Sequence, residues 1–248
     1  MRLTRVHVEA PLSVGSRIAV EGTAANHIAR VLRLRAGDAL TLFNGNGAEF
    51  AATIEQLHRD AAMVRIDTER AVSRESPLSL TLAQGISRGE RMDWILQKAT
   101  ELGGSRIVPL FTERSVVRLD SRQAERKLQH WRAVAIAACE QCGRNRVPEI
   151  ALPTDLFEFL RSATQPRTTR LLLSPNAAAS IDEVGADTAG ITVLIGPEGG
   201  LTDDEQEVAL RSGFTPVRMG PRILRTETAA IAALCILQQR LGDLRNQA

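Results

Sequence analysis

From Leu78 onward, short apolar runs alternate with segments of helical periodicity, and this alternation constrains the fold more than any other feature. Short runs that are apolar at nearly every position are typical of parallel strands covered on both faces. Strands that alternate with helices predict an α/β fold built on a parallel sheet. The runs are Leu78–Gln84, Arg106–Leu110, Arg170–Ser174, Thr192–Gly196 and Pro216–Met219.

The segments between these runs carry helical start and stop signals. Ser87 with Glu90, and Thr202 with Glu205, have the spacing of capping boxes, and glycine follows several of the segments where a helix would end. The last segment is apolar nearly all round, so we expect it to be buried against backbone or a second subunit. The predicted helices are Ser87–Leu102, Ser121–Cys142, Thr202–Ser212 and Glu227–Leu241.

Residues 1–72 have a different texture, in which short β-like runs are separated by turn signals such as Asn44–Gly47. We expect a small β-barrel-like domain over 1–72, a linker near Ser73–Pro77 and a larger domain over 73–248. A chain of 248 residues can bury one large core and a small one. The predicted elements of the small domain are strands Leu3–Val8, Ala39–Phe43, Glu49–Ile54 and Ala62–Ile66 and a helix Thr23–Leu34.

Composition argues against membrane, metal and redox proteins. No run approaches the roughly 20 apolar residues of a spanning helix, and the start of the chain lacks an apolar signal segment, so we expect a cytoplasmic location. The three cysteines, Cys139, Cys142 and Cys235, are expected to be reduced thiols. Cys139 and Cys142 have no second pair to complete a zinc site, so no metal is expected.

The net charge of +2 conceals an uneven distribution. Residues 88–146 carry 12 basic and 7 acidic side chains, whereas residues 147–248 carry 9 and 13. Of the 31 basic residues, 29 are arginine, whose planar guanidinium suits phosphates and bases. The basic middle therefore favours a nucleic-acid partner, although a genome rich in arginine codons would produce the same excess.

A glycine-rich loop, Gly196–Gly200, joins a predicted strand directly to a capped helix. Ligands bind at the carboxyl ends of strands in open α/β sheets, and glycines allow the backbone to approach them closely. The loop lacks the Lys-Ser/Thr of a nucleotide-triphosphate loop, and Glu198 would repel a pyrophosphate. The pattern favours a nucleoside ligand without phosphates, with an ordinary tight turn as the alternative.

A second bend, Gly220–Pro221, follows the last predicted strand and leads to a polar cluster at a helix start. Thr226 is suited to the N-cap position, and Glu227 would complement the helix dipole. Arg225 could contact a ligand or could equally be a solvated cap residue.

The whole chain resembles the RsmE-type 16S ribosomal RNA uridine-N3 methyltransferases, which belong to the SPOUT superfamily of knotted methyltransferases. The resemblance depends on six segments in order, namely Asn26–Arg33, Arg88–Gly103, Pro109–Val117, Glu140–Arg144, Ile195–Gly200 and Arg222–Ala229. It implies a PUA-like RNA-binding barrel followed by an α/β domain whose last segment forms a trefoil knot. It also implies a homodimer that binds S-adenosylmethionine in the knot and receives RNA of the small ribosomal subunit across the dimer interface.

The resemblance and the chemistry of the reaction together suggest residue roles. Catalytic candidates are Arg225, Glu198, Glu227, Arg114 and Glu140. RNA-binding candidates are Arg5, His27, Arg30, Arg33, Arg88, Arg91, Lys98, Arg122 and Arg144. The cofactor candidates, several of which would act through the backbone, are Leu173, Ser174, Leu194, Ile195, Gly196, Pro197, Glu198, Gly199, Gly200, Met219, Gly220, Ile223, Leu224, Arg225 and Thr226.

Methylation of uridine N3 requires removal of an imide proton with a pKa of roughly 10. Arginines at the uracil oxygens would ease that loss, and a carboxylate would accept the proton. N3 lies on the Watson–Crick edge, so the base must be unpaired or flipped. Trp94 and Trp131 could stack on bases, although we expect both in the core.

Three other functions fit part of the pattern. A SPOUT methyltransferase for a different RNA position would share the cofactor residues. A non-catalytic RNA-binding relative would retain only the fold. A nicotinamide enzyme is disfavoured because no Gly-x-Gly-x-x-Gly loop follows the first strand of the larger domain.

Overall fold

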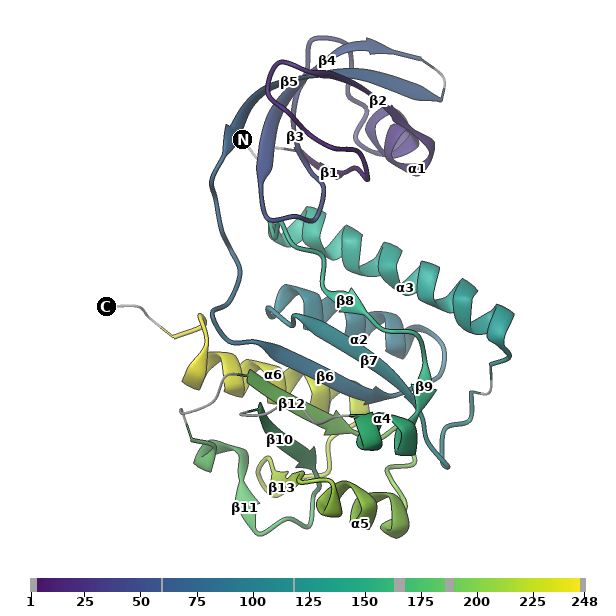
Figure 1. Ribbon diagram of the computed structural model, residues 1–248, viewed down its shortest axis with the longest axis vertical. Coiled ribbons are helices and arrows are strands. Elements are labelled where there is room, and N and C mark those ends of the chain that lie inside the picture. The colour runs from purple at the N-terminus through teal and green to yellow at the C-terminus, as the bar shows by residue number, and fades with distance from the viewer. Residues whose placement is uncertain (1–3, 59, 118, 163–167, 186–189, 246–248) are drawn as a thin grey trace. The chain divides into compact units, whose positions relative to one another are not determined.

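A computed structural model describes residues 4–58, 60–117, 119–162, 168–185 and 190–245 (Figure 1). The chain divides into two compact units. The first comprises residues 1–75 and 136–147, and the second comprises residues 76–135 and 148–248. Residues 136–147 thus belong to the first unit, although their position in the sequence predicted them in the larger domain over 73–248.

The first unit is built on a five-stranded sheet of order β1-β3-β4-β5-β2. β1 pairs with β3 in parallel, and the other pairs are antiparallel. Inward side chains such as Leu42, Ile54 and Val64 form its core together with Ile28. The strands are β1 (Arg5–His7), β2 (Arg17–Glu21), β3 (Ala39–Phe43), β4 (Glu49–Leu57) and β5 (Ala61–Arg70).

The single helix predicted over Thr23–Leu34 is shorter and irregular. A short α-helix, α1 (Gly22–Asn26), continues as a π-helical turn, η1 (His27–Val31). Arg33 follows with φ of 55°, and it is the only non-glycine residue with positive φ in the described part of the chain. The wider turn and the left-handed residue end the helix early.

The second unit contains a sheet of order β11-β13-β10-β12-β6-β7-β8, with β9 also paired to β7. Every pair in it is parallel, so the predicted parallel sheet is confirmed. β8, β9 and β11 were not predicted, because strands of two residues leave no periodic pattern. The strands are β6 (Leu80–Gly85), β7 (Arg106–Phe111), β8 (Glu149–Ile150), β9 (Thr154–Asp155), β10 (Thr168–Leu173), β11 (Ala179–Ser180), β12 (Gly190–Ile195) and β13 (Thr215–Arg218).

Helices cover both faces of this sheet (Figure 1). α2 packs against α6, which contacts β12, while α4 packs against α5 and both contact strands. Neighbouring residues of β6, Leu82 and Ala83, point to opposite faces and are both fully buried. The helices are α2 (Glu90–Glu101), α3 (Ser121–Cys142), α4 (Leu156–Ser162), α5 (Asp203–Arg211) and α6 (Thr226–Leu241), with a 3-10 turn η2 at Ile181–Glu183.

Of the predicted caps, one is confirmed and two are wrong. Thr202 caps α5 and exchanges hydrogen bonds with Glu205, as a capping box requires. α2 instead begins after Gly89, whose φ of 59° sets the turn, and Ser87 does not cap it. α6 begins after Arg225 without a side-chain cap. Thr226, predicted as that cap, uses its hydroxyl as a donor to the Gly196 carbonyl.

Candidate active site

A cavity of about 610 Å³ lies in the second unit, at the carboxyl ends of the neighbouring strands β10, β12 and β13. The segments that follow these three strands supply its walls. Both glycine-containing bends of the sequence, Gly196–Gly200 and Gly220–Pro221, are among these segments. Volumes of this size suit a nucleoside-sized ligand.

Nearly all of the proposed cofactor residues are brought together at this cavity. Leu194 and Gly220 are the exceptions: Leu194 is fully buried inside β12, and Gly220 is exposed in the bend with φ of 64°. The cavity is lined by the remaining candidates, Leu173, Ser174, Ile195, Gly196, Pro197, Glu198, Gly199, Gly200, Met219, Ile223, Leu224, Arg225 and Thr226.

The glycine loop is held tightly by its surroundings. A Cβ atom on Gly196 would lie 2.9 Å from the backbone of Gly200, closer than real side chains approach. Arg114 Nη1 donates to the carbonyl oxygens of Gly199, at 3.0 Å, and Leu201, at 3.4 Å. Arg114, a catalytic candidate from the sequence, therefore supports the loop and does not line the cavity.

Glu198 lines the cavity, but its carboxylate is already engaged. Oε1 accepts hydrogen bonds from the Arg88 backbone N–H at 3.0 Å and from Arg91 Nη1 at 2.7 Å. Burial alone would raise the pKa of Glu198, but these hydrogen bonds and the Arg91 charge outweigh it and lower the pKa. A carboxylate that is stabilised in its charged form is a poor proton acceptor.

We expect Arg91→Ala to lower the free energy of unfolding by an amount that depends on pH. Because folding lowers the pKa of Glu198, the stabilisation is present at neutral pH and is lost as pH falls through that lowered pKa. The free energies of unfolding of wild type and Arg91→Ala should differ by less than about 1 kcal/mol at neutral pH, since the pair is partly exposed. Urea denaturation across pH should show the difference shrinking below about pH 4, and a constant difference would contradict the ion pair.

Arg225 and Glu227 lie at the N-terminal end of α6, and both line the cavity. Glu227 is half-buried, and its Oε2 is fully enclosed without a hydrogen-bond partner among the described residues. Arg225 is exposed. Two further exposed arginines, Arg218 and Arg222, also line the cavity. Neither arginine was given a role of its own from the sequence, although Arg222 opens one of the six segments that carry the resemblance.

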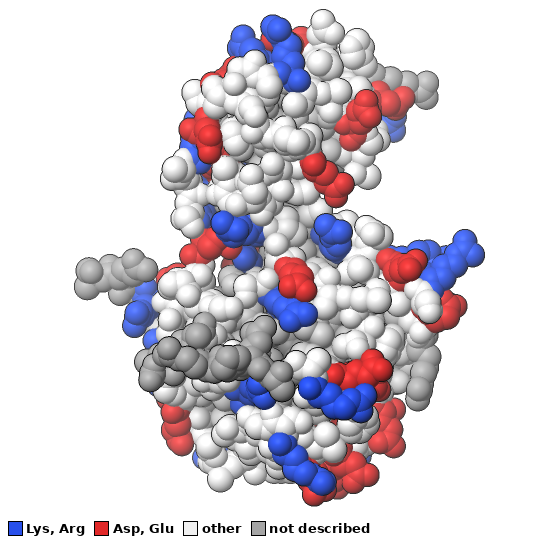
Figure 2. Space-filling view, viewed as in Figure 1, with Lys and Arg blue, Asp and Glu red and all other residues white. Residues whose placement is uncertain are grey.

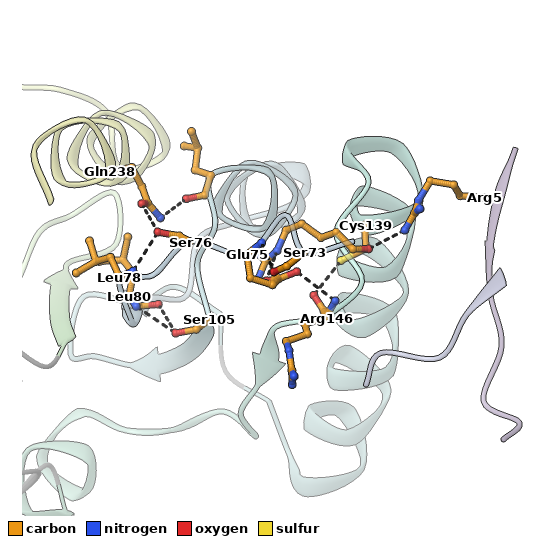
Figure 3. A network of polar contacts seen from close by, with 12 residues as sticks. Arg5, Ser73, Glu75, Ser76, Leu78, Leu80, Ser105, Cys139, Arg146 and Gln238 are labelled. Atoms are coloured by element: carbon orange, nitrogen blue, oxygen red, sulfur yellow. Dashed lines mark hydrogen bonds and ion pairs between the residues drawn. The ribbon is translucent and has the colours of Figure 1, made fainter. Parts of the chain in front are cut away.

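Of the sequence candidates that lie in the first unit, three belong to a polar network, part of which, with Arg5 and Glu75, is labelled in Figure 3. Arg5 Nη1 donates to buried Glu49 at 2.6 Å, and its Nη2 donates to Asn145 Oδ1 at 2.6 Å. Arg144 is only 4% exposed and pairs with Glu75 at 2.6 Å. Glu140, the third candidate, accepts from the His7 backbone N–H at 3.0 Å. Arg5 and Arg144 are thus largely buried side chains of this unit, each paired with a carboxylate, and their assignment to RNA contacts stays a prediction.

Glu49→Ala should destabilise the first unit by about 3 kcal/mol, because it leaves the nearly buried Arg5 without its charge partner. Burial favours a raised pKa for Glu49, but hydrogen bonds from Arg5 and Arg74 lower the pKa, so the carboxylate is charged at neutral pH. The control is Glu55→Ala on the same strand, whose solvent-exposed pairing with Arg17 should contribute far less. Chemical denaturation measures both, and equal losses would contradict the buried pair.

The other RNA-binding candidates lie in both units. In the first unit, Arg30 and Arg33 are exposed and His27 is half-buried, and Arg122 of the second unit is also exposed. In the second unit, Arg91 lines the cavity, Arg88 is exposed beside it through its bond to Glu198, and Lys98 is bound to Glu101 at 2.8 Å.

The two tryptophans differ. Trp131 is 2% exposed and lies in the core as expected, whereas Trp94 is 56% exposed on α2, so the expectation of a core position for Trp94 is wrong. Met92, Ile95, Leu96 and Ala99 are the buried apolar residues of α2. Trp94 lies on the opposite, solvent-exposed face of the helix.

On the face shown in Figure 2, basic and acidic side chains are interspersed, so the basic excess of the sequence forms no broad patch there.

The three cysteines are free thiols, and burial raises the pKa of Cys139 to about 12, which leaves it unreactive. Within the described ranges, no group of three or more His, Cys, Asp or Glu side chains could hold a metal ion. No helix of the described chain has the length and apolarity to span a membrane.

Fold and site together define an α/β protein that binds a small ligand at the carboxyl edge of a parallel sheet. An RNA methyltransferase domain model matches residues 74–238, and an RNA methyltransferase PUA domain model matches residues 20–67. A ribosomal RNA small subunit methyltransferase E from Buchnera aphidicola is 35% identical over 243 residues, which cover 98% of each chain. The chain belongs to the ribosomal RNA small subunit methyltransferase E family of RNA methyltransferases.

Two solved structures are similar along nearly the whole chain. A protein from Legionella pneumophila with bound S-adenosylmethionine is 41% identical, with a TM-score of 0.95 over 98% of this chain and 100% of that one. The small subunit methyltransferase E of Neisseria gonorrhoeae, bound to S-adenosylmethionine, is 37% identical, with a TM-score of 0.91 and the same coverage. The predicted fold class, a SPOUT methyltransferase domain preceded by a PUA-like domain, is confirmed.

Proposed function

We propose that the protein transfers a methyl group from S-adenosylmethionine to N3 of a uridine in 16S ribosomal RNA. The observation that carries this proposal is the cavity at the carboxyl edge of the sheet, which is lined by the glycine loop Gly196–Gly200 and by residues on both sides of the second bend, Met219 and Arg222 among them. The relatives named as small subunit methyltransferases, and the two similar solved structures that contain S-adenosylmethionine, support the same ligand.

The residues present fit such a cofactor. Gly196, Gly199 and Gly200 expose backbone groups at the cavity wall, where a nucleoside can be held without selective side chains. Glu198 and Glu227 place negative charge in the cavity wall, which suits the positively charged sulfur of the ligand. When bound, S-adenosylmethionine supplies a methyl group on a positively charged sulfur, and that sulfur becomes a neutral thioether.

Among the three carboxylates considered from the sequence, we favour Glu227 as the acceptor of the N3 proton. Its side chain lines the cavity and has no hydrogen bond or ion pair among the described residues, so it can take a proton without first breaking another interaction. Glu198 is committed to Arg88 and Arg91. Arg225, at the same wall, would stabilise the negative charge that develops on a uracil oxygen as N3 loses its proton.

The cavity rim also suits the RNA backbone. Arg218, Arg222 and Arg225 are exposed, and no side-chain hydrogen bond or ion pair is found for them among the described residues. Three guanidinium groups without acidic partners in that part of the chain can bind phosphates on either side of a flipped uridine. Because each phosphate contact releases counterions, binding should weaken steeply with salt.

One experiment separates this proposal from its alternatives. Purified protein is incubated with labelled S-adenosylmethionine and either 16S ribosomal RNA or intact small subunits, and the product is mapped by mass spectrometry. A single N3-methyluridine in 16S RNA supports the proposal. Methylation at another position or in another RNA supports a different specificity, and cofactor binding without transfer supports a non-catalytic relative.

We also propose that the protein acts as a homodimer through α6, and in the cytoplasm, where ribosomal RNA is available. Ile231, Ala232, Cys235 and Ile236 share the face of α6 that is turned away from the buried residues, and all four remain partly exposed. An apolar helical face of this kind is suited to a second copy of the chain. Ala232→Glu should convert a dimer to a monomer in sedimentation experiments, and an unchanged sedimentation coefficient would exclude this face.

A further inference from the structure

We propose that Gln84 is a positioning residue that joins the two loops of the cofactor cavity to each other. The inference deepens the proposed function, because it requires that S-adenosylmethionine binds in that cavity. Gln84 is the last but one residue of β6 and is fully buried. It does not line the cavity, and no motif in the sequence marks it.

The side-chain amide of Gln84 lies where three elements meet. Its Nε2 donates to the carbonyl oxygen of Gly85 at 2.9 Å and approaches that of Gly196 at 3.3 Å. The same nitrogen donates to Thr226 Oγ1 at 2.9 Å. Thr226 Oγ1 donates in turn to the Gly196 carbonyl at 2.7 Å. Gly196 begins the glycine loop and Thr226 begins α6, so this small network ties the two loops together.

The direction of the side chain follows from the strand. Gln84 is two residues from Leu82 and four from Leu80 along β6. Because side chains of a strand alternate between the two faces of the sheet, all three point to the same face. That is the face on which α6 lies, as the bond to Thr226 requires. The amide orientation is also determined, because carbonyl oxygens can only accept and the nitrogen must therefore face them.

Close packing makes this network a control point for the shape of the cavity. A Cβ atom on Gly85 would lie 2.5 Å from the Pro197 backbone nitrogen, so the end of β6 and the glycine loop are already in tight contact. Gly196 and Thr226 both line the cavity, although they are 30 positions apart along the chain. Without Gln84 the two walls lose a shared donor, and we expect their spacing to become less well defined.

Gln84→Met retains the size of the side chain and removes its donors. We expect the dissociation constant for S-adenosylmethionine to rise about tenfold, the equivalent of one or two lost hydrogen bonds. The matched control is Gln238→Met. Gln238 is also fully buried in this unit, where it donates to the Leu102 carbonyl at 2.8 Å and accepts from Ser76 Oγ at 2.7 Å (Figure 3). Both variants should lower the melting temperature, but only Gln84→Met should weaken cofactor binding.

Thr226 provides a second and independent measurement. Thr226→Val removes the hydroxyl and should also weaken cofactor binding, whereas Thr226→Ser retains the hydroxyl and should bind nearly as wild type does. In the double variant Gln84→Met/Thr226→Val, the loss should be smaller than the product of the single losses, because both side chains act on the Gly196 carbonyl. This test remains available if Gln84→Met does not fold.

Calorimetric titration of each folded variant with S-adenosylmethionine distinguishes the outcomes. Failure of the wild type to bind would overturn the proposed function. If wild type binds, and Gln84→Met binds equally well, the inference about Gln84 is wrong while the proposed function stands. An equal loss of affinity in Gln238→Met would assign Gln84 a merely structural role and overturn the inference. Selective loss at Gln84 and Thr226, with non-multiplicative coupling, supports it.

Discussion

Glu227→Gln should lower kcat for methyl transfer by at least about 100-fold, the usual contribution of a general base. Glutamine retains the size and polarity of the side chain but cannot accept the N3 proton. Since Glu227 Oε2 has no partner within the described chain, the substitution breaks no hydrogen bond recorded for that atom. The dissociation constant for S-adenosylmethionine should therefore change little. Single-turnover transfer to 16S ribosomal RNA, with calorimetric titration of the cofactor, measures the two quantities separately.

Glu207→Gln is the control for this substitution. Glu207 lies on α5, does not line the cavity, and is 63% exposed in an ion pair with Arg211. It should be fully active. If Glu227→Gln is as active as wild type, Glu227 is not the proton acceptor, and Glu198 and Glu140 remain the candidates for that role.

Gly85→Ala should weaken S-adenosylmethionine binding by at least about tenfold and destabilise the protein by about 1–3 kcal/mol. The added methyl group would lie 2.5 Å from both the Cδ and the backbone nitrogen of Pro197. Neither atom belongs to a flexible side chain, so the glycine loop itself must move. Because Gly196–Gly200 lines the cavity, this movement changes the cofactor site directly.

Gly185→Ala tests whether any glycine substitution has this effect. No described atom lies within 4 Å of the position that a methyl group on Gly185 would occupy, and its φ is not positive, so alanine should be accommodated. Thermal unfolding and cofactor titration of the two variants are compared. If Gly85→Ala binds the cofactor as tightly as Gly185→Ala, the close approach between β6 and the loop does not control the cavity.

Much of the fold could be predicted, because most of its strands and helices have clear apolar patterns. β3 has the predicted bounds Ala39–Phe43, and α3 has the predicted bounds Ser121–Cys142. The loop after β12 was also predicted as a ligand loop, because glycines at the carboxyl end of a strand let the backbone approach a ligand. The loop after β13 was assigned to the cofactor through the family resemblance. Arg17–Glu21 was missed as a strand because charged ends and little burial weaken its apolar pattern.

The roles of individual polar residues could not be predicted in the same way. Arg5 and Arg144 are of the residue type that commonly binds phosphates. Their burial depends on Glu49 and Glu75, which are 44 and 69 positions away along the chain. Gln84 presents the opposite case, because a single glutamine at a strand end gives no signal. Its importance depends on Gly196 and Thr226, which only the folded chain brings to it.

The first unit is formed by two segments that are far apart in the sequence, and this limits how it can be produced as a separate fragment. Residues 136–147 supply Asn145, which binds both Arg5 and the Val72 carbonyl, and Arg144, which binds Glu75. A fragment that ends at the linker would leave the buried charges of Arg5 and Glu75 short of partners. We therefore expect the first unit to be less stable without residues 136–147, so grafting it onto another enzyme would require this distant segment to be transplanted with it.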